Sequence, residues 1–296
     1  MFDHFVCSVV VVPPLMVFVA RLLADRLAPS IAARAVAWSA AVAAVASTIS
    51  LAVFAAKAVA EEPSVGRALG WSAAVVARDT ASEPWVSSLS AALLVAAVAS
   101  VAYRWWRQRR ILGLLPAGGP DLVVIVPDPA AGAFAVPGRP GHVVVTTGMR
   151  DLLSDRQFEA LLAHERAHLA DGHHRLVRVT ELAVAAHPAL WWVGRHVDYL
   201  VERAADERAA AVLGNRRIVA HAIGTAALSG RATPRPAALH AAAGVVLRRV
   251  SRLLSPGPHA VPAVLAVLPP ALAAFSVIWT GEGLLDLIEL LQAAAR

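Results

Sequence analysis

Four long apolar stretches constrain the fold of this chain more than any other feature of its sequence. They cover residues 5–23, 31–56, 86–103 and 260–279, and each approaches the roughly 20 residues that an α-helix needs to cross a bilayer. The composition agrees, because 58% of the residues are apolar and only 16% are charged, which is unusual for a soluble protein. We therefore predict a mainly α-helical integral membrane protein with about four transmembrane helices.

Basic residues near the ends of these stretches predict the orientation, because Lys and Arg favour the cytoplasmic side of a membrane. Three groups of arginines fall on one side: Arg21, Arg26 and Arg34; Arg104, Arg107, Arg109 and Arg110; and Arg248, Arg249 and Arg252. We expect a multi-pass protein of the plasma membrane with three domains. Residues 1–110 form an N-terminal region of three transmembrane helices, 111–258 a cytoplasmic domain, and 259–296 a C-terminal transmembrane helix with a short tail.

The net charge of +6 could indicate a nucleic-acid partner or an anionic lipid surface. The basic run at 104–110 includes Trp105 and Trp106 and follows a predicted span, a position typical of an interfacial anchor in the lipid bilayer. We therefore expect no direct binding of nucleic acid. The single cysteine, Cys7, excludes an internal disulfide and a thiolate metal cluster.

The cytoplasmic region predicts a small sheet followed by helices. Short β-branched runs occur at 122–126 and 142–147, with a shorter one around Phe134. Ser154 and Gln157 have the spacing of a capping box, and Gly172 fits a helix end. We expect a buried or partly inserted helix at 176–193, which Arg178 and Glu181 interrupt, a second helix at 197–213, and a loop at 230–236.

The helix predicted between Ser154 and Gly172 contains the segment His164-Glu165-Arg166-Ala167-His168, which has the pattern H-E-x-x-H. Two imidazoles at i and i+4 project from one face of a helix and can bind one ion. Neutral imidazoles suit Zn²⁺, and zinc lowers the pKa of a bound water to about 7. Glu165 is placed to take the proton of that water. The sequence thus predicts one zinc ion with His164 and His168 as ligands and Glu165 as the catalytic base.

A catalytic zinc site needs a third protein ligand. Glu202 and Asp206 lie at i and i+4 on the helix predicted at 197–213, so that Glu202 could bind the ion while Asp206 orients a ligand imidazole. Taken alone, these carboxylates are more typical of a solvated helix face, because Arg203, Glu207 and Arg208 lie beside them.

Residues 133–208 resemble the catalytic core of the membrane gluzincins, especially the BlaR/MecR-type antirepressor peptidases and more distantly the HtpX-type proteases. The shared landmarks occur in one order: Ala133-Phe134-Ala135, the strand 142–147, His164-Glu165-x-x-His168, His187-Pro188-Ala189-Leu190-Trp191-Trp192, and Glu202-x-x-x-Asp206-Glu207. The resemblance implies a zincin-like α+β domain in which Glu202 is the third ligand and Asp206 supports the site. It also implies that Ala133, Phe134 and Ala135 form an edge strand that binds substrate.

The expected activity is that of a zinc endopeptidase at the cytoplasmic face of the membrane. Its partners would be a protein or peptide substrate, and the resemblance implies a cytoplasmic transcriptional repressor. Two alternatives stay open: an HtpX-like quality-control protease, and a non-catalytic zinc-binding membrane signalling protein, in which Glu165 would have no role. The remaining histidines His142, His173, His174 and His196 are expected to be surface or hydrogen-bonding residues.

Overall fold

The computed structural model describes residues 2–23, 25–114, 123–229, 236–255 and 263–296. Among these residues, four helical segments are long and apolar enough to cross a membrane: Phe2–Leu23, Pro29–Ala60, Trp85–Arg110 and Val264–Ala294. The prediction of a mainly α-helical protein with about four transmembrane helices is confirmed. The predicted loop at 230–236 lies, except for Pro236, outside the described residues.

The first segment is continuous but changes its winding. It consists of α1 (Phe2–Phe5), the π-helix η1 (Val6–Val11) and α2 (Val12–Leu23). Pro13 and Pro14 lie at the start of α2, and proline can neither donate a backbone hydrogen bond nor tolerate the carbonyl of the preceding turn. The wider winding before them accommodates this defect, as π-bulges commonly do.

Helix α3 (Pro29–Ala60) is the central element of the molecule. It begins with proline at its first turn, where the missing N–H costs nothing, and alanines lie on several of its faces. Small side chains let other helices approach closely, and α3 contacts α6 (Trp85–Leu114), α9 (His173–Ala186), α10 (Trp191–Leu213) and α13 (Leu268–Ala294). The short helices α4 (Pro63–Leu69) and α5 (Ala73–Arg78) connect α3 to α6.

The C-terminal helix extends further than the sequence predicted. The 3₁₀ helix η4 (Ala263–Val267) leads into α13, which continues past Trp279 to Ala294. The acidic residues Glu282, Asp286 and Glu289, which were assigned to a short tail, therefore lie on this helix. Residues 260–262 of the predicted span lie outside the described residues.

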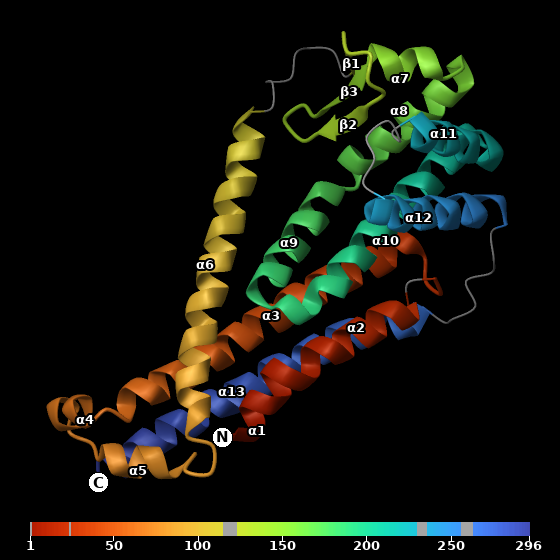
Figure 1. The fold of residues 1–296 in the computed structure, drawn as a ribbon. Helices are drawn as coiled ribbons and strands as arrows, with labels where there is room; N and C mark the ends of the chain where they lie inside the picture. Colours follow the sequence, from red (N-terminus) through yellow and green to blue (C-terminus); the bar gives the residue numbers. More distant parts are fainter. Residues whose placement is uncertain (1, 24, 115–122, 230–235, 256–262) are drawn as a thin grey trace.

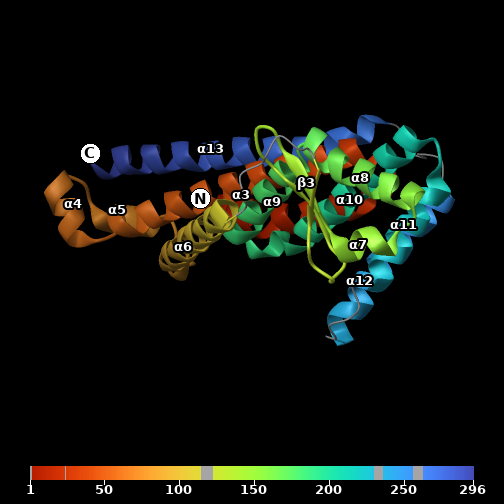
Figure 2. The same ribbon diagram turned by 90° about the horizontal axis from the view of Figure 1, so that it is seen from above.

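The predicted sheet is present and has three strands. They are β1 (Val123–Val126), β2 (Ala133–Val136) and β3 (His142–Thr146), in the order β1-β3-β2. β1 is parallel to β3 and β2 is antiparallel to it, with Phe134 opposite Val144. β2 is therefore an edge strand. Figure 1 shows the sheet at one end of the molecule, and both views place it far from α4, α5 and the C-terminus (Figures 1 and 2).

The helices after the sheet are α7 (Thr147–Leu152), α8 (Asp155–Ala170), α9, α10, α11 (Arg216–Ser229) and α12 (Pro236–Leu254). The capping box of Ser154 and Gln157 begins α8. The predicted helix at 176–193 is wrong in its bounds: α9 ends at Ala186, and α10 begins at Trp191 rather than near residue 197. Pro188 explains the break, because the residue before a proline is driven out of helical geometry, and His187 is extended.

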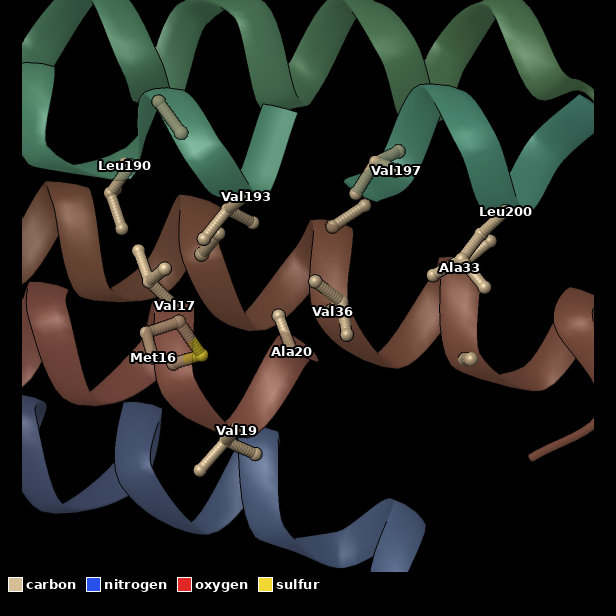
Figure 3. Packing of buried hydrophobic residues seen from close by; sticks show 14 of the residues in the cluster. Met16, Val17, Val19, Ala20, Ala33, Val36, Leu190, Val193, Val197 and Leu200 are labelled. Atoms are coloured by element: carbon tan, nitrogen blue, oxygen red, sulfur yellow. The ribbon is translucent and has the colours of Figure 1, made fainter. Parts of the chain in front are cut away.

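A buried apolar layer joins α10 to the membrane-spanning helices. In Figure 3, Val193, Val197 and Leu200 of α10, together with Leu190 just before it, point toward α3 and α2. On the other side, Val36 of α3 belongs to the same cluster. Because α10 also bears Glu202, this packing fixes the candidate third ligand relative to the membrane-spanning part of the chain.

Candidate metal centre

Helices α8 and α10 bring the three predicted ligands together. Nε2 of His164 lies 3.1 Å from Nε2 of His168, which lies one turn further along α8. The carboxylate of Glu202 on α10 has one oxygen 3.5 Å from Nε2 of His164 and the other 3.5 Å from Nε2 of His168. One ligand atom from each residue lies within 4.8 Å of the other two.

These separations fit a zinc ion. Ligand atoms at 2.0–2.2 Å from a tetrahedral zinc lie roughly 3.3 Å from one another, close to the observed 3.1 and 3.5 Å. Two imidazole nitrogens and one carboxylate oxygen also match the ligand types of catalytic zinc sites, which keep a fourth position open. The donor set therefore fits zinc both in geometry and in chemistry.

Each histidine has a partner on its second ring nitrogen. Nδ1 of His164 lies 3.0 Å from Oδ1 of Asp206, although the ring is not turned into hydrogen-bonding geometry. Nδ1 of His168 lies within hydrogen-bonding distance of Nδ1 of His173, at 3.0 Å. Such contacts set the tautomer and orientation of ligand imidazoles.

His173, which was expected to be only a surface or hydrogen-bonding residue, is 3% exposed and begins α9. Gly172 precedes it with φ of 64°, a left-handed conformation that favours glycine. This residue turns the chain between α8 and α9, so that His173 faces back toward His168. The sequence feature that could have indicated this role is Gly172, which comes directly after the helix that bears His164 and His168.

Arg249 of α12 also belongs to the site. Its Nη1 lies 2.7 Å from Oε2 of Glu202, and its Nη2 and Nε donate to Asp206 at 2.7 and 2.8 Å. The charge pattern had assigned this arginine to a basic membrane flank. The side chain of Arg249 is only 11% exposed and lies between the two carboxylates, so this arginine contributes to the site itself.

The electrostatics of the cluster favour a positive charge among the ligands. Burial lowers the pKa of His164, but Asp206 and Glu202 outweigh burial and raise it to about 9. Burial and the charge of His164 lower the pKa of His168 to about 4. Burial raises the pKa of Glu202, yet His164 and Arg249 bring it down to about 2. The site thus holds Glu202 ionised beside a neutral His168, the forms in which both bind metals, whereas His164 has to release its proton when it binds an ion.

Glu165 lies in the same cluster, next to the edge strand. Burial raises the pKa of its carboxyl group, and the charge of His164 and the backbone N–H of Ala135 offset part of that rise. A carboxylate whose affinity for protons is increased in this way suits a general base.

A cleft of about 1470 Å³ runs past these residues. Its walls include β2, the turn after it, α8, α9 and α10, together with Gln108 of α6. Gln108 donates to Glu181 at 2.6 Å and accepts from Arg178 at 3.1 Å. The two charges that interrupted the predicted helix at 176–193 therefore join α9 to α6 at the side of the cleft.

The edge of β2 is open toward this cleft. The N–H of Thr146 donates to the carbonyl of Gly132, and antiparallel pairs alternate between bonded and non-bonded positions. Phe134 therefore pairs inward with Val144, while the backbone groups of Ala133 and Ala135 face outward. The contact between Ala135 and Glu165 agrees with this alternation.

Part of this chain is similar in sequence to known proteins. Residues 110–232 match the model of Peptidase family M48. M48 peptidases are zinc-dependent, and the matched residues include His164, Glu165, His168 and Glu202.

Two curated relatives also match, both named "Protease HtpX homolog", from Limosilactobacillus reuteri strain DSM 20016 and from L. reuteri subsp. reuteri strain JCM 1112. Each is 33% identical over 82 residues, which cover 24% of this chain and 27% of the relative. This chain therefore spans only about a quarter of the length of the curated relatives it matches. No solved structure matches it. Together, the M48 match, these relatives and the four apolar helices support a membrane-type M48 metallopeptidase.

Proposed function

We propose that this chain is a membrane-bound zinc endopeptidase. The observation that carries the proposal is the convergence of three ligand atoms, from His164, His168 and Glu202, within 4.8 Å of one another. Beside them, Glu165 lies between the ligands and an open strand edge in a large cleft. A structural zinc site would be closed by four protein ligands and would have no use for such a base.

His164, His168 and Glu202 would hold one Zn²⁺, with His173 and Asp206 orienting the imidazoles. Zinc supplies polarisation of the scissile carbonyl and lowers the pKa of a water molecule. Glu165 accepts a proton from the attacking water and passes it to the leaving amine, as general acid–base residues do. Its contact with the backbone of Ala135 keeps the carboxylate close to the strand on which substrate is expected.

The edge strand β2 would bind the substrate in an extended conformation. The backbone N–H and carbonyl of Ala133 and the carbonyl of Ala135 point outward, while the N–H of Ala135 contacts Glu165. A peptide can add to such an edge as a further strand. Phe134 is 47% exposed and offers an apolar contact to the substrate side chain beside it. The substrate class is therefore a protein or peptide that can present an unfolded segment.

The three-domain division at residues 110 and 258 and the cytoplasmic orientation belong to the same proposal. Support comes from arginines in the C-terminal part of α6. Arg109 lies over the ring of Trp105 at 3.9 Å and Arg110 over that of Trp106 at 4.7 Å, as expected for a basic, aromatic anchor at the cytoplasmic interface. The plasma membrane is the expected location.

Two biological roles suit this chemistry. Regulatory cleavage of a cytoplasmic transcriptional repressor follows from the resemblance to antirepressor peptidases. Quality control of membrane proteins is the alternative that the names of the HtpX-homologous relatives favour. Proteomics of cells with the native chain and with Glu165→Gln would separate them, because the first role predicts one accumulated repressor and the second many damaged membrane proteins.

The activity itself is tested with the full chain purified in detergent, with zinc, on fluorescently labelled casein as an unfolded substrate. Glu165→Gln keeps the shape of the side chain but removes its basicity, so we expect cleavage to fall by about 10²–10⁴-fold with zinc still bound. Equal cleavage by both forms would refute Glu165 as the base. Zinc binding without cleavage by either form would favour the non-catalytic signalling alternative.

A further inference from the structure

We propose that Arg249 is a positioning residue for the metal centre, which holds Glu202 in the orientation that ligates the ion. The inference rests on the proposed function, since it concerns the same zinc site. It assigns a role to a residue outside the segment 110–232 that matches the peptidase family.

The guanidinium group of Arg249 is shared between two carboxylates of α10. It makes the two contacts of a fork to Asp206, at 2.7 and 2.8 Å, and a third to Oε2 of Glu202, at 2.7 Å. The side chain is only 11% exposed. Charge-assisted contacts of this kind are stronger and more directional than neutral hydrogen bonds.

Without Arg249, repulsion between neighbouring carboxylates would destabilise this face of α10. Glu202 and Asp206 are one turn apart, and like charges at that spacing repel. Glu165, in the same cleft, adds a third carboxylate to the cluster. The single charge of Arg249 and the two charges of a zinc ion together balance the three carboxylates.

The contact also fixes how the carboxylate of Glu202 is turned. Arg249 binds Oε2, which lies 3.5 Å from Nε2 of His164, and this orientation places Oε1 3.5 Å from Nε2 of His168. A carboxylate that is fixed in this way does not have to be ordered when the ion binds. We therefore expect Arg249 to increase zinc affinity and to define the geometry of the site.

Helix α12 offers a matched control. Arg252 lies one turn further on the same helix and contacts Asp25, at 3.7 Å, rather than the carboxylates of the site. Arg252→Gln removes the same charge from the same helix without touching Glu202. If zinc affinity fell only because α12 packs less tightly, the loss would appear in both Arg249→Gln and Arg252→Gln.

The test compares the native full chain with Arg249→Gln, Arg249→Lys and Arg252→Gln, all purified in detergent. Zinc affinity is measured by competition with a chromogenic chelator, and the Co²⁺-loaded protein gives an absorption spectrum that reports ligand geometry. We expect Arg249→Gln to weaken zinc binding by about 10- to 100-fold and to change the cobalt spectrum. Arg249→Lys should be intermediate, because lysine keeps the charge but lacks the fork, and Arg252→Gln should match the native chain.

Unchanged affinity and an unchanged spectrum in Arg249→Gln would overturn the proposal, as would an equal loss in Arg252→Gln. If Arg249→Gln does not fold, Arg249→Lys decides by the same two measurements. Failure of the native chain itself to bind zinc would refute the proposed function instead, so that the two failures are distinguishable.

Discussion

Replacing Asp206 by asparagine tests how the surroundings of the ligands control the metal centre. Asp206 is only 2% exposed and contacts both Nδ1 of His164 and the fork of Arg249. Asparagine keeps the shape but removes the charge. Residues that orient ligand imidazoles typically contribute 10- to 100-fold in metal affinity, and tenfold corresponds to about 1.4 kcal/mol. We therefore expect zinc binding to weaken by about 1.4–2.7 kcal/mol.

The same change should destabilise the metal-free protein. Breaking a buried ion pair costs about 3–5 kcal/mol, and we expect a value at or below the lower end because Glu202 still contacts Arg249. The assay is chelator competition for zinc, together with thermal unfolding of the metal-free chain in detergent.

Glu207→Gln is the matched control, since Glu207 is the next residue and pairs with Arg216 at a partly exposed position. It should leave zinc affinity unchanged. Native affinity in Asp206→Asn would refute the reasoning, because the contact with His164 would then contribute nothing to ligand orientation.

Two further predictions concern the packing and the substrate edge. Leu200 is fully buried between α10 and α3, so Leu200→Ala should lower the free energy of unfolding by about 2–5 kcal/mol. Val212→Ala, at a position 72% exposed on the same helix, should leave the free energy of unfolding unchanged. Equal effects of the two changes would contradict a core shared by α10 and α3. Ala133→Pro removes an outward N–H from the first position of the edge strand, where proline is tolerated, and leaves the contact between Ala135 and Glu165 in place. Peptidase activity should then fall at least about tenfold with the fold retained. Val136→Pro, which removes an inward N–H, should unfold the sheet, and full activity of Ala133→Pro would argue against substrate binding at this edge.

Local sequence signals predicted much of the fold. The apolar stretches located the spans because length and hydropathy alone decide whether a helix can cross a bilayer. The capping box located the start of α8, and the β-branched runs located the strands. Boundaries were less accurate: Pro188 moved the start of α10, and α13 continued past the end of the apolar stretch at residue 279 to Ala294.

The candidate site was predictable where one helix or one family pattern supplied it. His164, Glu165 and His168 follow from their spacing on α8, whereas Glu202 and Asp206 needed the resemblance, because nothing in a mixed charge pattern distinguishes a ligand from a surface carboxylate. His173 and Arg249 depend on how α9 and α12 pack against α8 and α10. Such tertiary contacts join residues far apart in the chain, and spacing does not reveal them.

The central claim is that His164, His168 and Glu202 bind one zinc ion. X-ray absorption of the purified, zinc-loaded full chain tests it most directly when the native chain is compared with Glu202→Ala. We predict one zinc per chain with two imidazole nitrogens and a carboxylate oxygen at about 2.0–2.2 Å, and loss of that oxygen with much weaker binding in the variant. A native chain that retains no zinc, or a variant whose zinc has the same ligands and affinity, would contradict the account.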